Sequence, residues 1–230
     1  MINFREESFK MIRIAIDGPS GSGKSTLAKA VARELGIVYV DTGALYRTIG
    51  YYVFLNGKDP HDHEAVKSLL PYIDIELKYE NGSQRVILNG EDLGDKIRLP
   101  QMSMYASAVS AQPAVREFLL DIQKKMAREN SVVMDGRDIG TVIIPDADVK
   151  IFLTASDETR AMRRTLELRE KGVEVNYEDV LADMIERDKN DKNRDIAPAV
   201  PADDAIIFDN SVMTVEESLR EIVRLVNERK

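Results

Sequence analysis

Short apolar runs, each ending close to a polar residue, recur along the 230-residue chain. Five such runs cover residues 11–17, 37–41, 131–135, 149–155 and 205–209. Runs of this kind are typical of strands buried on both faces of a parallel sheet. Apolar residues at helical spacing lie between or after them, over 25–35, 113–129, 157–171, 177–189 and 214–229. The pattern predicts an α/β protein with a five-stranded parallel sheet flanked by helices.

One region departs from this pattern. Within residues 72–93, every second residue from Ile73 to Tyr79 is apolar and the residues between them are polar, as in a half-buried strand. The pair Asn81-Gly82 then favours a tight hairpin turn. Helical patterns near 61–70 and 100–110 flank the segment. We therefore expect a small antiparallel sheet, inserted as a subdomain.

The composition argues against several classes of function. Hydrophobic residues make up 43% of the chain and charged residues 31%, which is ordinary for a globular domain. The net charge of -8 provides no general field for nucleic acid. There is no cysteine, and no apolar run approaches the roughly 18 residues of a membrane span. We expect a cytoplasmic monomer without a nucleic-acid or membrane partner.

Residues 16–26, "IDGPSGSGKST", contain a full match to G-x-x-x-x-G-K-[ST], placed between a predicted strand and a predicted helix. Glycines let the backbone wrap around phosphates, and the helix N-terminus favours the negative charge. Lys24 would reach the β and γ phosphates, and the Ser25 hydroxyl would hold Mg²⁺. The alternative is a glycine-rich turn that binds nothing.

The motif leaves open whether the protein is a switch, a motor or a kinase. A GTPase switch should carry an Asn-Lys-x-Asp element for guanine, and the sequence has none, so ATP is the favoured donor. Asp135, at the end of a predicted strand, would orient Mg²⁺ through water. An aspartate in a plain turn at the end of a strand is the other interpretation.

A phosphoryl acceptor needs its own cations. Arg47 and Arg137 follow predicted strands, and ligands of open α/β sheets bind at the carboxyl ends of strands. Arginine grips phosphate in a planar, bidentate way. Arg187, Asp191 and Arg194 fall on one helix face if the helix persists. The alternatives are surface charge for the first two and a solvated run of ion pairs for the last three.

Four segments carry a family resemblance: "IDGPSGSGKST", "DTGALYR", "DGRDIGTVIIPDADVKIFL" and "RDKNDKNRDIAPAVPADDA". Together they resemble the bacterial cytidylate kinases, which are P-loop enzymes that phosphorylate CMP and dCMP with ATP and Mg²⁺. The resemblance spans residues 12 to about 225. It implies a single kinase domain with a core over 11–41, 130–156 and 197–230, a CMP-binding region over 42–129 and a helical lid over 157–196.

The resemblance also implies roles for individual residues. The ATP phosphates would be bound by Gly18, Pro19, Ser20, Gly21, Ser22, Gly23, Lys24, Ser25 and Thr26, with Arg163 and Arg164 of the lid. The CMP phosphate would be handled by Thr42, Arg47, Arg137 and Arg187. Cytosine would be read by Ser107, Arg116 and Asp138, and the ribose and the transferring group would meet Asp191 and Arg194. The catalytic residues would be Lys24, Arg137, Arg187 and Arg194.

The chain departs from the family at Thr42, where serine is common; the hydroxyl is kept, but the added methyl group would tighten the pocket. The cytosine assignment also makes chemical sense, because a carboxylate accepting from the 4-amino group beside an arginine donating to N3 or O2 is complementary to cytosine. Two alternatives stay open: a kinase for another nucleoside monophosphate or small acceptor, and a non-catalytic ATP-dependent switch.

Overall fold

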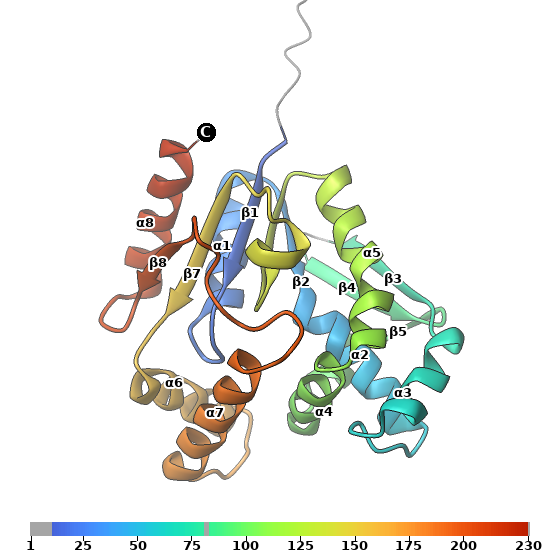
Figure 1. Ribbon diagram of the computed structural model, residues 1–230. Coiled ribbons are helices and arrows are strands. Elements are labelled where there is room, and N and C mark those ends of the chain that lie inside the picture. The colour runs from blue at the N-terminus through green and yellow to red at the C-terminus, as the bar shows by residue number, and fades with distance from the viewer. Residues whose placement is uncertain (1–10, 81–82, 230) are drawn as a thin grey trace, which may run out of the picture.

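The predicted five-stranded parallel sheet forms the centre of the molecule. The computed structural model describes residues 11–80 and 83–229 (Figure 1). The strands are β1 (Arg13–Asp17), β2 (Val38–Asp41), β6 (Val132–Gly136), β7 (Val149–Thr154) and β8 (Ile206–Asp209). They lie in the order β2-β6-β1-β7-β8, and every neighbouring pair is parallel. The carboxyl ends of all five strands therefore open on the same side.

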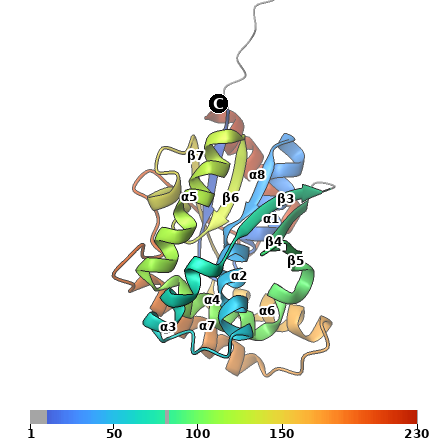
Figure 2. The ribbon, with the colours of Figure 1, turned by 90° about the vertical axis from the view of Figure 1, so that its right-hand side faces the viewer.

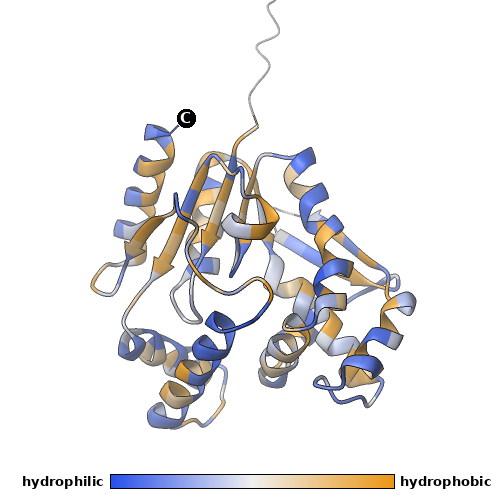
Figure 3. Cartoon of the chain, viewed as in Figure 1, coloured by the Kyte–Doolittle hydropathy of each residue, from blue (hydrophilic) through white to orange (hydrophobic). Residues whose placement is uncertain are grey.

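Helices cover both faces of this sheet, as the continuous apolar strands require. Ile14 and Ile16 of β1 pack in one cluster with residues of α1 (Lys24–Leu35) and α8 (Val215–Glu228). Ala15, between them, joins the opposite cluster with Ala127 of α5 (Pro113–Glu129) and residues of the short π-helical turn η3 (Ile139–Ile143). Figure 3 shows the apolar strands enclosed between helices with polar outer faces. Each fully buried isoleucine stabilises the fold by about 1.5–3 kcal/mol.

Two helices, α6 (Asp157–Glu170) and α7 (Tyr177–Lys192), pack together below the carboxyl ends of the strands (Figure 1). A small apolar cluster of Ala161, Val180 and Met184 joins them. Both helices were predicted, but α7 runs three residues beyond the predicted end at residue 189. Along the described ranges, no helix combines the length and the apolar character that a membrane crossing requires.

The predicted insertion is also present. Strands β3 (Ile75–Glu80), β4 (Ser83–Leu88) and β5 (Glu91–Asp92) form an antiparallel sheet, and the predicted turn at residues 81–82 lies outside the described residues. Around this sheet lie α3 (His63–Leu69), η1 (Leu70–Tyr72), η2 (Gly94–Arg98) and α4 (Pro100–Ser110). Figure 1 shows the small sheet on the β2 side of the central sheet, and Figure 2 shows it close to α2.

Helix α2 (Thr42–Leu55) is an element that the sequence analysis did not predict. It begins directly after β2, where the Asp41 carboxylate accepts the Ala44 N–H at 2.9 Å and so satisfies one of the free donors of the first turn. Leu45, Ile49 and Val53 follow at helical spacing and are fully buried. Helix α2 packs against α4 and joins the insertion to the core.

Candidate active site

The phosphate loop occupies residues 18–23, between β1 and α1. At Gly18, a Cβ atom would lie 2.0 Å from the Leu153 carbonyl oxygen, so that the loop can follow β7 this closely only without a side chain. Gly23 has a φ of 89° and starts α1 in the left-handed conformation. The loop is therefore bent onto the N-terminus of a helix, which is where anions bind.

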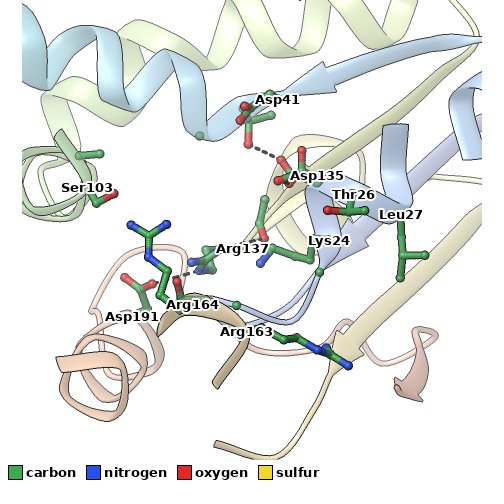
Figure 4. Close-up of a pocket in the computed structure, with 18 of the residues that line it drawn as sticks. Lys24, Thr26, Leu27, Asp41, Ser103, Asp135, Arg137, Arg163, Arg164 and Asp191 are labelled. Atoms are coloured by element: carbon green, nitrogen blue, oxygen red, sulfur yellow. Dashed lines mark hydrogen bonds and ion pairs between the residues drawn. The ribbon is translucent and has the colours of Figure 1, made fainter. Parts of the chain in front are cut away.

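Lys24 is the cation of this loop. Its side chain is buried, and Nζ donates a hydrogen bond to the Pro19 carbonyl oxygen at 2.7 Å. Burial lowers the pKa of Lys24 well below its usual value, and the nearby Arg137 guanidinium lowers it further. Figure 4 shows the Lys24 and Arg137 side chains converging. A phosphate placed between them would supply the negative charge that this buried lysine needs.

Behind the lysine, Ser25 Oγ and the Tyr39 hydroxyl each donate to one carboxylate oxygen of Asp135, both at 2.8 Å. Asp135 lies within β6 and is only 4% exposed, so the interpretation as an aspartate in a plain turn is wrong. Burial, followed by the nearby Asp41 carboxylate, raises the pKa of Asp135. Hydroxyl and carboxylate oxygens are ligands that Mg²⁺ prefers, so this pair fits the metal that the sequence implies.

A cleft of about 890 Å³ opens beyond the phosphate loop and is lined by α2, α4, α6 and α7. Arg163 and Arg164 of α6 both line it, on different sides (Figure 4). Arg163 donates to the carbonyl oxygen of Asn210 at 2.9 Å and to its side-chain oxygen at 3.0 Å. Arg164 pairs with Glu167 at 2.8 Å. Both expected lid arginines thus reach the cleft that contains the loop.

Across the cleft, Arg47 donates from Nη2 to Asp41 at 2.8 Å, and its Nε is buried with no hydrogen-bond partner among the described residues. The Thr42 hydroxyl donates to the Asp135 main-chain oxygen at 2.7 Å. These contacts place Arg47 and Thr42 at the end of β2, next to the end of β6. The surface-charge interpretation of Arg47 is wrong, because its side chain is only 24% exposed.

The three residues expected to read a base all line the same cleft. Arg116 and Asp138 form a buried ion pair, and Arg116 also donates to the Ser110 carbonyl oxygen at 3.1 Å. The Arg116 guanidinium lies 5.6 Å from the centre of the Tyr46 ring. Burial raises the pKa of Asp138, and Arg116 opposes this shift. Ser107 of α4 lines the wall beside this pair.

Asp191 joins two arginines. Arg137 Nε lies 3.1 Å from one oxygen of Asp191, and Arg194 Nη2 lies 3.8 Å from the other. Arg194 also donates to Ser110 Oγ of α4 at 3.1 Å. Asp191 is only 6% exposed, so a solvated run of ion pairs does not describe this segment. The Arg137 side chain is 19% exposed, so surface charge does not describe it either. The expectation that one helix carries the set is wrong for Arg194, because α7 ends at Lys192.

Arg187, one turn before Asp191, completes this group of cations. Burial and the neighbouring Arg137 lower the pKa of Arg187 to about 10. Its Nε has no hydrogen-bond partner among the described residues. Partly buried cations that repel each other and keep an unused donor indicate a site prepared for an anion.

A tether that the sequence did not reveal joins α6 and α7 to the phosphate loop. Arg160 of α6 donates to the Ser20 carbonyl oxygen at 2.7 Å and forms an ion pair with Asp188 of α7. Asp188 in turn accepts the Ser20 N–H at 3.2 Å. Both residues lie in segments rich in charge, and no local pattern separates them from the surface charges around them.

Asp17 was also missed. Its two carboxylate oxygens accept the N–H groups of Ile139 and Gly140, at 2.8 and 2.7 Å. Asp17, directly before the phosphate loop, thus holds the turn that follows Arg137 and Asp138. Burial raises the pKa of Asp17 to about 7. In the sequence, its position directly before Gly18 of the phosphate-loop motif was the signal that could have marked Asp17 as part of the site.

A phosphate loop on a parallel sheet, facing a group of arginines across one cleft, is the arrangement that a P-loop kinase needs to pass a phosphoryl group between two ligands. The family model named cytidylate kinase matches residues 14–228. The chain belongs to the cytidylate kinase family.

Curated relatives agree along nearly the whole chain. It is 50% identical over 216 residues to a cytidylate kinase of Caldicellulosiruptor saccharolyticus, covering 94% of this chain and 96% of that one. It is 48% identical over 224 residues to a cytidylate kinase of Flavobacterium johnsoniae, covering 95% and 97%. A solved structure of an uncharacterized protein from Eubacterium ventriosum aligns with a TM-score of 0.50 at 16% identity, over 94% and 98% of the two chains, and supports the fold alone.

Proposed function

We infer that the protein transfers the γ-phosphoryl group of ATP to CMP, and to dCMP, giving ADP and the corresponding diphosphate. The observation that carries this inference is the buried Arg116–Asp138 pair, which lines the same cleft as Lys24. A paired donor and acceptor set at this position suits a cytosine ring, and the phosphate loop suits ATP.

Asp138 would accept the 4-amino group of cytosine, and Arg116 would donate to N3 or O2, with Ser107 beside them. Uracil turns a carbonyl oxygen toward the carboxylate and leaves buried polar groups unpaired, which costs more than a lost methylene contact. The acceptor phosphate would lie among Thr42, Arg47, Arg137 and Arg187, and Asp191 and Arg194 would meet the ribose and the transferring group.

The donor phosphates would be wrapped by residues 18–26, with Lys24 against the β and γ groups and Arg163 and Arg164 approaching from the lid. Mg²⁺ bound with ATP neutralises phosphate charge. The Ser25 hydroxyl would hold it, with Asp135 acting through water, and their oxygen atoms fit that task. A Ser25→Ala variant should require more Mg²⁺ for half-maximal rate while the KM for CMP stays constant.

Transfer needs no general base in this scheme, because the attacking phosphate oxygen is already largely ionised at pH 7. The rate comes from positioning and from cations around the γ-phosphoryl group, of which Lys24, Arg137, Arg187 and Arg194 are the proposed set. We assign residues 157–196 to a lid that excludes water, 42–129 to acceptor binding, and 11–41, 130–156 and 197–230 to the core. The monomeric state and the cytoplasmic location stay predictions.

One experiment tests the proposal. The purified protein is incubated with MgATP and CMP, dCMP, UMP, AMP or shikimate, while ADP release and acceptor loss are followed together. We expect equal amounts of ADP and diphosphate with CMP and dCMP and much less with UMP. Preference for another acceptor would identify a different kinase, and slow ADP release without transfer would identify a switch.

A further inference from the structure

One carboxamide joins the inserted hairpin to the edge of the central sheet. Gln84 of β4 accepts the Asp41 N–H with Oε1 at 2.8 Å and donates from Nε2 to the Asp41 carbonyl oxygen at 3.2 Å. Asp41 is the last residue of β2, an edge strand of the sheet. Edge strands leave main-chain groups unpaired, and here one side chain satisfies both groups of one residue.

Asp41 is a junction between that contact and the acceptor side of the cleft. Its Oδ1 accepts the Ala44 N–H at 2.9 Å and starts α2, and its Oδ2 accepts from Arg47 Nη2 at 2.8 Å. The main chain of Asp41 is therefore held by Gln84 while its carboxylate holds Arg47. Moving the hairpin relative to β2 would move the carboxylate that orients this arginine.

The neighbouring residue on β4 provides a contrast. Arg85 projects from the opposite face of the strand and pairs with Asp92 inside the small sheet, with 2.7 Å between Nε and Oδ2. It strengthens the hairpin without contacting Asp41. Substituting Arg85 therefore tests the stability of the hairpin, whereas substituting Gln84 tests its attachment to Asp41.

We propose that Gln84 is a positioning residue that couples the inserted hairpin, through Asp41, to Arg47 and so to acceptor binding. This rests on the proposed function, in which Arg47 binds the acceptor phosphate. Without the carboxamide, water takes both main-chain groups of Asp41, and Arg47 loses its fixed orientation. The donor side contains no part of this path, so ATP binding keeps its affinity.

The test compares Gln84→Ala and Gln84→Glu with Arg85→Ala as the matched control. Loss of two hydrogen bonds should raise the KM for CMP about threefold to tenfold in Gln84→Ala, with kcat and the KM for ATP unchanged. Gln84→Glu has the same size and can still accept the Asp41 N–H, but its carboxylate repels the Asp41 carbonyl oxygen instead of donating to it, so its KM for CMP should also rise. Arg85→Ala should keep both KM values, even if its hairpin melts earlier.

Amide hydrogen exchange gives a second readout that general destabilisation would not reproduce. The Asp41 N–H should exchange faster in Gln84→Ala and at the wild-type rate in Arg85→Ala. An unchanged KM for CMP in Gln84→Ala, or an equal rise in Arg85→Ala, overturns the coupling and leaves the proposed function standing. A wild-type protein that transfers nothing to CMP overturns both, and the acceptor panel reveals that case first.

Discussion

The donor and acceptor sides of the cleft are built in different ways. The donor side is a continuous stretch, residues 18–26, that presents main-chain N–H groups at a helix N-terminus, and its Lys24 is hydrogen-bonded to a carbonyl oxygen. The acceptor side gathers side chains from α2, α4, α5, α7 and the loops after β6 and α7, and three of its arginines, Arg47, Arg116 and Arg137, are already paired with carboxylates.

This difference has an energetic consequence. An anion that binds at the donor side compensates the charge of the buried Lys24. An anion that binds at the acceptor side must share arginines with Asp41 or Asp191. Removing one partner of a buried ion pair leaves an uncompensated charge, which costs about 3–5 kcal/mol. Substitutions on the donor side should therefore reduce turnover alone, and those on the acceptor side should reduce stability as well.

The largest effect is expected at Lys24. Lys24→Ala removes a preorganised charge, so kcat/KM should fall at least about a hundredfold in steady-state assays with MgATP and CMP. Because burial disfavours the charged lysine, the variant should unfold at the same temperature as the wild type or a higher one. A rate near that of the wild type would refute the phosphate-loop assignment.

Next comes Asp138. Asp138→Ala leaves Arg116 buried without its ion-pair partner, so we expect a loss of stability of about 3–5 kcal/mol in chemical unfolding. The preference for CMP over UMP should also drop about tenfold or more. Competition between the two acceptors measures this ratio and is independent of the fraction of folded enzyme. An unchanged ratio would remove Asp138 from base recognition.

Arg194→Ala should have a smaller effect, because Asp191 keeps Arg137 as a partner. Turnover should slow about tenfold with both CMP and dCMP, as expected for one lost contact to a charged group. Initial rates with each acceptor at saturating MgATP measure this. Full activity with either acceptor would show that Arg194 only fastens the chain after α7 to α4.

The smallest effect on turnover is expected at Asp17, and here the measurement is stability against pH. A carboxyl group whose pKa rises from 3.8 unfolded to about 7 folded stabilises the fold most below pH 3.8, and this contribution is lost as the pH rises toward 7. Asp17→Asn cannot ionise. The unfolding free energy of the wild type minus that of Asp17→Asn should therefore fall between pH 5 and 7, by up to about 1 kcal/mol per pH unit. If this difference in unfolding free energy stayed constant with pH, the raised pKa of Asp17 would be contradicted.

The contrast between a continuous donor side and a dispersed acceptor side also explains which features the sequence could predict. Contiguous signals predicted the five strands, most helices and the phosphate loop. Helix α2 was missed because "TGALYRTIGYYVFL" is rich in glycine, threonine and aromatic or β-branched residues, which are weak helix formers, and the helix depends on its Asp41 cap and on packing against α4. The contacts of Asp17 with Ile139 and of Gln84 with Asp41 join residues far apart in the chain, which no periodicity reveals.

The tether at Ser20 gives α7 a mechanical role. Within little more than one turn, this helix carries Asp188, which holds the phosphate loop, and Arg187 and Asp191, which belong to the proposed acceptor site. A helix moves as a rigid rod over so short a distance. Any displacement of α7 therefore changes the contacts of the phosphate loop and of the proposed acceptor site together, so that this helix cannot loosen its hold on one of them while its hold on the other stays unchanged.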